Sequence, residues 1–471
     1  MVSCQLNEDL TIIILAAGKG TRMKSSLPKV MHQIGGCSML QLVINQANIL
    51  QPLNIAVVIS EELQPFCKKI IEDNPNSRLN FILQNERKGT AHAVNTAIKN
   101  LQANNISLGK KILILYGDTP LITAKTINSL IAQQNSNLTL HNSVSVLAFR
   151  YRKNNNEVNR YGRIKAVESS SLIEKIIEFK DANLQELAID LCNSGIMLID
   201  SVVAFQCLDL ISNHNASGEF YLTDIVDIAN KNNLKCNFVE VDNDCELLGA
   251  NSPLELINLA NIQQQQIKNL LIDNGVVMAD PASVVVAFDT RIASGAVIEP
   301  FVVFKNGVEI AENVTIKSFS YLEGCKIGDN STVGPFARIR QKSILANQVQ
   351  IGNFVEVKNS TIASNSKINH LAYVGDAVIG SEVNIGAGTV FCNYDGFNKW
   401  QTTVEDKVFI GSNSTIISPV IIGNNAIIGA GSVISEDVAS DSLAVARCRQ
   451  QNLVNKANKL REKLKNKLVK Q

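Results

Sequence analysis

The most restrictive feature of this 471-residue sequence is a repeat with a period of six residues that begins beyond Pro281. Apolar residues occupy every sixth position in two runs, one of Ile292, Ile298, Phe304, Ile310, Ile316 and Leu322, the other of Val404, Ile410, Ile416, Ile422, Ile428 and Ile434. Such a long repeat is typical of a β-helix, in which each unit forms one short strand and turn, and three units complete a coil. We therefore expect a solenoid with these apolar side chains stacked inside.

The repeat is interrupted once, between Phe391 and Val404, by the segment FCNYDGFNKWQTT. An insertion that breaks the period must leave the solenoid as a loop. Loops that emerge from a rigid scaffold are common places for ligand contacts. The sequence therefore predicts an extruded loop at 391–403 with a functional role.

The first half of the chain has a different pattern, in which short apolar runs alternate with helical stretches. The runs are TIIILAAG at 11–18, NIAVVIS at 54–60, LNFILQ at 79–84, KILILYGD at 111–118 and SVSVLAF at 143–149. Apolar strands separated by helices predict a mostly parallel sheet that is covered on both faces, a Rossmann-like α/β fold. Ligands bind beyond the carboxyl ends of such strands, which here are LAAGKGTR and YGD.

Between these halves, residues 253–273 contain no glycine and keep apolar residues at helical spacing after Asn-Ser-Pro. This pattern predicts a helix. We expect three parts, namely an α/β domain at 1–235, a linker with a long helix at 236–274, and a β-helix domain with a basic tail at 275–471.

Composition excludes several classes of protein. Charged residues make up 18% of the chain and no run of 18 apolar residues occurs, so we expect no membrane span, and an acidic N-terminus argues against a secretion signal. The ten cysteines form no Cys-x-x-Cys pair, which favours reduced thiols in a cytoplasmic protein. Residues 447–471 carry nine Lys/Arg and one Glu, and thus a charge of +8 against −7 for the rest of the chain.

A glycine-rich turn follows the first apolar strand in the segment 15–23, LAAGKGTRM. Its glycines let backbone amides approach a phosphate chain, and Lys19 and Arg22 supply positive charge. Leu27-Pro-Lys29 comes shortly afterwards, and the whole pattern resembles the sugar-1-phosphate nucleotidyltransferase family. The alternatives for the turn alone are a strand-to-helix connection or a dinucleotide motif.

The resemblance continues over the first 251 residues and is specific to the uridylyltransferase half of the bifunctional family called GlmU. It implies that the following residues bind UDP-N-acetylglucosamine: Leu15, Ala16, Ala17, Gly18, Lys29, Gln84, Gly89, Thr90, Tyr116, Gly117, Asp118, Gly162, Glu178, Asn193 and Asn251. By this resemblance Gln84, Gly89 and Thr90 read uracil, and Gly162, Glu178 and Asn193 hold the sugar.

Uridylyl transfer brings two polyanions together, so catalysis should rest on positioning and charge neutralisation without a covalent intermediate. The resemblance places Mg²⁺ on Asp118 and Asn251, and carboxylate and amide oxygens suit this hard ion. Arg22 would steady the leaving pyrophosphate of UTP, and Lys29 the α-phosphate.

Four segments of the second half, at 334–340, 352–358, 370–376 and 384–389, resemble the acetyltransferase half of the same family, whose repeats form a left-handed parallel β-helix. The resemblance assigns glucosamine-1-phosphate to Arg340, Lys358, Tyr373, Asn384 and Lys399, and acetyl-CoA to Ala387, Asn393, Tyr394, Ser412, Ala430 and Arg447. The basic tail could attract CoA phosphates, with a solvated helix as the alternative.

An amine attacks a thioester only when it is neutral, so a base with a pKa near 6.5 is required, and histidine meets that requirement. His370 is the only histidine in the repeat domain and lies within a matched motif. We therefore expect His370 to be the general base, although a packing role is the usual alternative for an isolated histidine.

The resemblance implies a homotrimer formed through the β-helix, with Lys399 reaching a neighbouring subunit's cleft. Small-molecule substrates are the expected partners, with no nucleic acid and no membrane. A nucleotidyltransferase with a purely scaffolding β-helix, as in glucose-1-phosphate adenylyltransferases, is the main alternative, and His370, Asn384 and the loop argue against it. A decayed transferase is disfavoured by the intact Arg22, Lys29 and Asp118.

Overall fold

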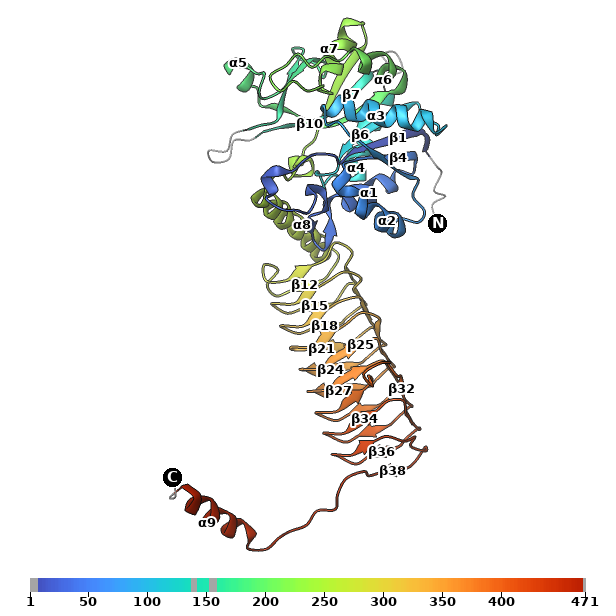
Figure 1. Cartoon of the computed structure of the whole chain (residues 1–471), viewed down its shortest axis with the longest axis vertical. Helices are drawn as coiled ribbons and strands as arrows, with labels where there is room; N and C mark the ends of the chain where they lie inside the picture. The colour runs from blue at the N-terminus through green and yellow to red at the C-terminus, as the bar shows by residue number, and fades with distance from the viewer. Residues whose placement is uncertain (1–6, 137–141, 152–158, 469–471) are drawn as a thin grey trace. The chain divides into compact units, whose positions relative to one another are not determined.

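The computed structural model describes residues 7–136, 142–151 and 159–468. The chain divides into two compact units, Met1–Gln266 and Ile267–Gln471. The boundary lies inside α8 (Pro253–Asp273), which spans the helix predicted at 253–273. Figure 1 labels α8, whose olive colour marks residues near the middle of the chain.

Unit 1 is built on a twisted sheet whose strands follow the order β11-β7-β10-β6-β1-β4-β5, with β8 and β9 attached beside β10. The strands are β1 (Asn7–Leu15), β4 (Pro52–Ile59), β5 (Leu79–Leu83), β6 (Lys111–Tyr116), β7 (Asn142–Arg150), β8 (Gly162–Ala166), β9 (Ile173–Ile177), β10 (Leu191–Asp200) and β11 (Lys235–Glu240). The strands predicted near 11, 54, 79, 111 and 143 are confirmed.

Helices cover both faces of this sheet, as apolar parallel strands require. They are α1 (Met39–Ile49), α2 (Gln64–Asp73), α3 (Thr90–Ala103), α4 (Ala124–Ser136), α5 (Leu184–Leu187), α6 (Ser201–Cys207) and α7 (Asp224–Lys231). One core cluster joins α3 and α7 to one face, and a second joins α1 and α4 to the other. Ile12, Ile13 and Ile14 of β1 are fully buried because they lie between these layers.

Strand β10 pairs antiparallel with both β6 and β7, and it is not among the strands predicted from the apolar runs. Its apolar run is interrupted by Asn193-Ser194-Gly195, and the register with β7 shifts between Asn193 and Met197. Because these residues divide the apolar run into two short pieces, the sequence pattern does not predict a strand here. The interruption also places the buried Asn193 opposite Gly162, where β8 pairs with β10.

Unit 2 is a left-handed parallel β-helix made of three sheets (Figure 1). The first runs from β12 (Val277–Met278) to β38 (Leu443–Ala444), the second from β13 (Val285–Val286) to β37 (Val433–Ile434), and the third from β14 (Arg291–Ile292) to β35 (Ile421–Ile422). Partners lie one coil apart, as in Val297 opposite Thr315.

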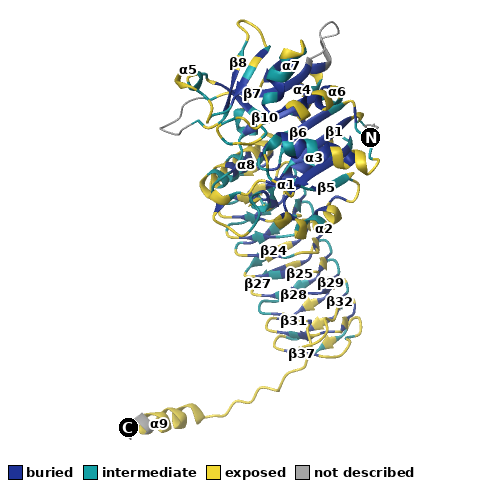
Figure 2. Cartoon of the chain, turned by 45° about the horizontal axis from the view of Figure 1, so that its top comes forward, coloured by how far each residue is buried: buried dark blue, intermediate teal, exposed yellow. Residues whose placement is uncertain are grey.

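All twelve apolar residues of the two predicted runs are buried, and Ile292, at 7% exposure, is the most accessible. Figure 2 shows the inner edges of the coils as buried. A loop is present where one was predicted at 391–403, but with shorter bounds, because β31 (Val390–Cys392) and β32 (Thr402–Val404) flank the segment 393–401. A final helix, α9 (Lys456–Leu468), follows the last coil.

Candidate active sites

The glycine-rich turn of unit 1 leads from β1 into the short helix η1 (Thr21–Met23). Gly20 has a φ of +57°, and a Cβ atom there would lie 2.6 Å from the Cβ of Lys29. Only glycine therefore lets the turn pass this close to Lys29 without strain. The glycine-rich turn and Lys29 are therefore in direct contact, as expected for two parts of one sequence motif.

Lys29 joins the two residues that were expected to hold the metal. Its ammonium forms an ion pair with Oδ2 of Asp118 and donates to Oδ1 of Asn251 at 2.9 Å. The side chains of Lys29 and Asp118 are only 11% and 17% exposed. Two hard oxygen ligands thus converge on one point that already accommodates a positive charge, which fits the preference of Mg²⁺ for oxygen.

Two cavities meet at the carboxyl end of β6. The first has a volume of 480 Å³ and is lined by the glycine-rich turn, Lys29, Gln84, Gly89 and Thr90. The second has a volume of 640 Å³ and is lined by Arg22 and Asn251, among others. Tyr116 and Asp118 line both cavities. One carboxylate therefore faces two adjoining spaces, each large enough for part of a nucleotide sugar.

In the first cavity, the amide of Gln84 is fixed by His92. Gln84 Nε2 lies 2.9 Å from His92 Nδ1. Burial and the nearby Lys88 ammonium lower the pKa of His92, so the neutral ring accepts this hydrogen bond. The carbonyl oxygen of Gln84 is then directed away from the histidine, and it can accept an N–H from a base.

Gly89 precedes α3 with a φ of +116°. A Cβ atom there would lie 2.5 Å from the carbonyl oxygen of Phe220. Thr90 accepts from the amide of Leu222 at 3.0 Å, which ties the same turn to the same segment. The turn expected to read uracil is therefore rigid.

The residues expected to hold the sugar gather beside β10. Gly162 lies directly opposite Asn193 in the register of β8 and β10, and a Cβ atom on Gly162 would lie 3.6 Å from Glu178 Oε2. Burial raises the pKa of Glu178, which accepts from Thr223 Oγ1 at 2.9 Å. These three residues lie together but line neither cavity.

The sequence assigned no role to two residues at these cavities, Arg87 and Tyr161, although Tyr161 belongs to the matched motif Tyr161-Gly162-Arg163. Arg87 lines the first, where it forms an ion pair with Glu62. Tyr161 lines the second and packs edge-on against Phe149, and burial raises its pKa to about 12. Their positions were a usable signal, because Arg87 lies between Gln84 and Gly89 and Tyr161 precedes Gly162.

The second candidate site lies on one corner of the β-helix. Nδ1 of His370 lies 2.6 Å from Oδ1 of Asn353, one coil earlier, and the two residues are paired in β24 (Gln350–Asn353) and β27 (Lys367–His370). An amide oxygen only accepts, so Nδ1 is the donor of this hydrogen bond and Nε2 is the ring nitrogen left for a proton transfer. His370 and Asn353 also line a groove of 430 Å³.

Three residues expected to bind acetyl-CoA occupy the equivalent corner position in the coils that follow His370. The amide of Gly388 donates to the carbonyl of His370 at 3.3 Å, that of Asn413 to Ala387 at 2.7 Å, and that of Gly431 to Ser412 at 2.8 Å. The column therefore runs through Asn353, His370, Ala387, Ser412 and Ala430. We call these five residues the corner column.

Arg447 lies next to the end of the corner column, since its Cδ would be 3.8 Å from a Cβ on Gly431. Asn384, on β30 (Asn384–Ile385), is paired with Lys367 of β27. Asn384 therefore lies on the sheet whose strand β27 ends at His370.

Basic side chains gather on the neighbouring sheet. Arg340 donates to Glu356 Oε1 at 2.8 Å, and Lys358 ends β25 (Glu356–Lys358). The adjacent Lys399 lowers the pKa of Lys358 through their direct contact, and Arg340 contributes to the same effect. Three cations therefore lie close to two acids, Glu356 and Asp376, which leaves an excess of positive charge at this place.

Within this single chain, Lys399 lies beside Lys358. The expectation that Lys399 reaches a neighbouring subunit's cleft concerns the assembled trimer and stays a prediction. Contacts inside the loop hold its fold. Tyr394 and Lys399 form an antiparallel bridge, and Asp395 accepts from the indole of Trp400 at 2.7 Å.

A buried carboxylate connects these parts. Asp376 is 8% exposed, and its two oxygens accept from the amides of Asn359 and Asn393. Its charge also acts on Lys358. Tyr373 packs its hydroxyl against Gly375, close to the amide nitrogen of Asn393. Asp376 therefore fixes Asn393 at the base of the loop.

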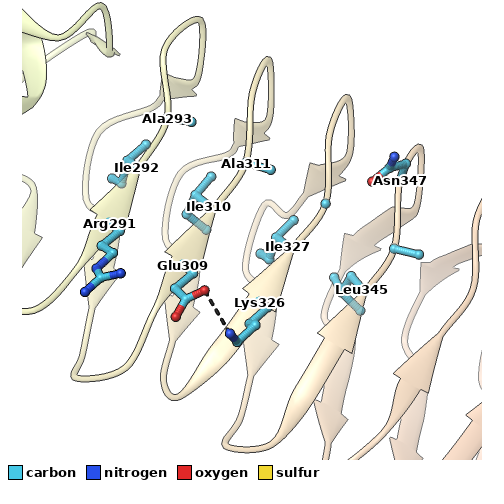
Figure 3. A pocket seen from close by; sticks show the side chains of 12 residues that line it. Arg291, Ile292, Ala293, Glu309, Ile310, Ala311, Lys326, Ile327, Leu345 and Asn347 are labelled. Carbon is cyan, nitrogen blue, oxygen red and sulfur yellow. Dashed lines mark ion pairs between the residues drawn. The ribbon is translucent and has the colours of Figure 1, made fainter. Parts of the chain in front are cut away.

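Another groove of 530 Å³ lies on a different part of the solenoid, between coils that include Arg291, Ile310 and Leu345 (Figure 3). An ion pair of 2.9 Å joins Glu309 and Lys326 across it. Its lining includes none of the expected site residues.

Within the described residues, no group of three or more His, Cys, Asp or Glu side chains is arranged to hold a metal. No helix in the described ranges combines the length and apolar character that crossing a bilayer requires. All nine cysteines of those ranges are free thiols.

Comparison with known proteins gives matches in both units. Residues 12–166 match the MobA-like NTP transferase domain, and residues 401–436 match the bacterial transferase hexapeptide repeat. The chain is 40% identical to the bifunctional protein GlmU of Paramagnetospirillum magneticum over 455 residues, which is 96% of each chain. It is 40% identical to that of Zymomonas mobilis, over 98% of this chain and 99% of the relative, and 41% identical to that of Bartonella quintana, over 96% and 97%.

Proposed function

The chain belongs to the bifunctional GlmU family, and from this premise we propose how its two sites divide the synthesis of UDP-N-acetylglucosamine. The enzyme transfers an acetyl group from acetyl-CoA to glucosamine-1-phosphate, and then a uridylyl group from UTP to N-acetylglucosamine-1-phosphate, with release of pyrophosphate. The assignment of residues to these steps is our proposal.

The observation that carries the proposal for unit 1 is the position of Asp118, which lines both cavities and pairs with Lys29. UTP would lie along the glycine-rich turn, with its base against Gln84, Gly89 and Thr90. The sugar phosphate would enter from the side of Gly162, Glu178 and Asn193. The two phosphates then meet at Asp118, where the reaction must occur.

Asp118 and Asn251 would hold Mg²⁺ between them, because their oxygens converge on one point. The ion neutralises phosphate charge when it is bound. Lys29 would then turn from these oxygens to the α-phosphate of UTP, and Arg22, in the second cavity, would hold the pyrophosphate. In-line attack by the sugar phosphate needs no covalent enzyme intermediate.

In unit 2, the phosphate of glucosamine-1-phosphate would bind to Arg340, Lys358 and Lys399, with Tyr373 and Asn384 beside the sugar. Acetyl-CoA would lie along the corner column, against Ala387, Ser412 and Ala430, with Asn393, Tyr394 and Arg447 at its sides. This direction brings the thioester to His370. Nε2 of His370 would take a proton from the amine as the amine nitrogen bonds to the thioester carbonyl carbon. The carbon–sulfur bond would then break, and the departing CoA thiolate would take up a proton.

We also propose that the enzyme acts as a homotrimer in the cytoplasm and supplies precursors of the cell wall. The hexapeptide repeat is consistent with assembly through the β-helix. Phe397 in the loop is 91% exposed, which suits burial against another subunit. Light scattering should give three chains per particle, and a fully active monomer would contradict this part of the proposal.

Separate assays of the two reactions on the purified chain test whether each unit carries its own activity. Supplied with acetyl-CoA and glucosamine-1-phosphate, it should form N-acetylglucosamine-1-phosphate without UTP. Supplied with UTP, Mg²⁺ and N-acetylglucosamine-1-phosphate, it should release pyrophosphate without acetyl-CoA. Loss of the first activity alone would favour a scaffolding β-helix.

A further inference from the structure

The final helix, α9, belongs to neither candidate active site. Its described side chains up to Asn466 are all exposed, and Figure 2 colours this part of the helix as exposed. Apart from the helical ladder, hydrogen bonds of the described tail are local, such as Lys456 to Leu453 at 3.3 Å and Arg461 to Asn458 at 3.2 Å. The surface of α9 is therefore available to a partner.

This surface has an apolar side. Leu460 and Leu464 are four residues apart and lie on one face of the helix, where they are 58% and 53% exposed. We call this pair the leucine strip, and the sequence repeats the leucine once more at position 468. The opposite face is polar, with Asn458, Glu462 and Asn466 at the same spacing.

Basic residues border the leucine strip on both sides. At 3.6 residues per turn, Lys456 and Lys463 lie along one edge, and Arg461 and Lys465 lie along the other. The single acid of the helix, Glu462, lies on the far face. Four basic side chains therefore lie beside the apolar surface, whereas Lys459 lies nearer the polar face.

We propose that α9 binds the surface of a lipid bilayer that contains anionic lipids. A helix that lies in the interface inserts its apolar face at the boundary of the acyl chains, while flanking lysines contact the headgroup phosphates. Each basic residue near such a surface strengthens binding about fivefold. The charge of +8 on residues 447–471 complements this partner, whereas the remaining −7 would be repelled by it.

Other partners explain less of the pattern. A nucleic acid would be attracted by the lysines but would make no use of an exposed leucine strip. A second copy of α9 would cover the leucines but bring the two basic borders together. Peripheral binding is compatible with the absence of a membrane-spanning helix in the described residues. It differs from the expectation of no membrane partner, which rested on the lack of a spanning segment.

Flotation of the full chain with vesicles tests the proposal. The chain should float with vesicles of phosphatidylcholine and phosphatidylglycerol at low salt, and should remain unbound with phosphatidylcholine alone. Leu460→Gln/Leu464→Gln keeps every charge and a good helix former, and should weaken binding at least about tenfold. Lys456→Gln/Lys463→Gln keeps the leucines and should weaken it on the order of twentyfold.

Asn458→Gln/Asn466→Gln on the opposite face is the matched control and should bind as the parent chain does. All variants should keep both transferase activities, because none of these positions lies in a proposed site. Two results would overturn the proposal. One is a parent chain that does not float with anionic vesicles, and the other is a leucine variant that binds them as tightly as the parent. Binding of double-stranded DNA at equal strength by parent and leucine variant, without flotation, would identify a nucleic-acid tail instead.

Discussion

The imidazole of His370 is held by Asn353, whose side-chain oxygen lies 2.6 Å from Nδ1. The two residues are paired in adjacent coils, so the backbone of the solenoid sets their distance. Asn353 thereby selects the tautomer of His370 in which Nε2 is free to accept a proton. The residue expected to be the base therefore depends on a partner that the sequence analysis did not identify.

Asn353→Ala should lower the turnover number of acetyl transfer by about tenfold to a hundredfold, because the ring loses its orientation. The Michaelis constant for acetyl-CoA should change little. Asn353→Asp should restore much of the rate, and should move the acid limb of the pH profile upward, because a carboxylate favours the imidazolium form. Equal rates and an unchanged profile in both variants would assign Asn353 a structural role only.

Asp376→Asn should raise the Michaelis constant for acetyl-CoA. The substitution turns one acceptor into a donor and leaves the amide of Asn359 or Asn393 without its partner, at a cost of about 1–3 kcal/mol. Steady-state kinetics of acetyl transfer would show the change. Glu436→Gln, on an exposed position of the last coils, is the matched control and should behave as the parent. A parental Michaelis constant in Asp376→Asn would contradict the positioning role.

Acid should lower both the stability of the chain and its affinity for UTP, because both depend on the neutral form of His92. Burial lowers the pKa of His92 below its ordinary value of 6.5, so the folded chain binds this proton less readily than the unfolded chain. The contribution of neutral His92 to the free energy of unfolding is complete above pH 6.5. It is lost as the pH falls from 6.5 through the lowered pKa of the folded chain. The melting temperature should therefore fall more between about pH 7.5 and 5.5 in the parent than in His92→Gln.

The Michaelis constant for UTP should rise over the same pH range, because a protonated ring cannot accept from Gln84. In His92→Gln this rise should be smaller. Identical pH dependences of both quantities in the two proteins would show that His92 does not control the pocket.

Chelation should separate the two activities. Removal of divalent cations with EDTA should reduce uridylyl transfer to background, because Asp118 and Asn251 would lack the ion that neutralises the phosphates. Acetyl transfer should continue at its original rate, since its site neutralises phosphate with Arg340, Lys358 and Lys399. Added Mg²⁺ should restore uridylyl transfer. Full uridylyl transfer in the chelated enzyme would exclude the proposed metal site.

Much of this architecture could be predicted because it rests on repetition. The six-residue repeat places Ile298, Ile316 and their equivalents inside every coil. The period of six residues is therefore enough to identify a β-helix. The motif around Gly20 and Lys29 was equally informative, because their close approach is a local constraint.

Contacts between distant positions were not predictable from pattern. Asn353 and His370 are 17 residues apart, and only the coil register brings them together. The location of Lys399 depends on hydrogen bonds within the loop, such as that between Asp395 and Trp400. Strand β10 was missed because its polar interruption at Asn193 breaks the apolar run.

The central claim is that two independent sites share one chain, and a pair of substitutions measured in both assays tests it most directly. Asp118→Ala should reduce uridylyl transfer to background and leave acetyl transfer unchanged. His370→Ala should lower acetyl transfer by about a hundredfold to ten-thousandfold, the usual contribution of a positioned base, and leave uridylyl transfer to N-acetylglucosamine-1-phosphate unchanged. A parallel loss of both activities in either folded variant, or parental acetylation by His370→Ala at neutral pH, would contradict the account.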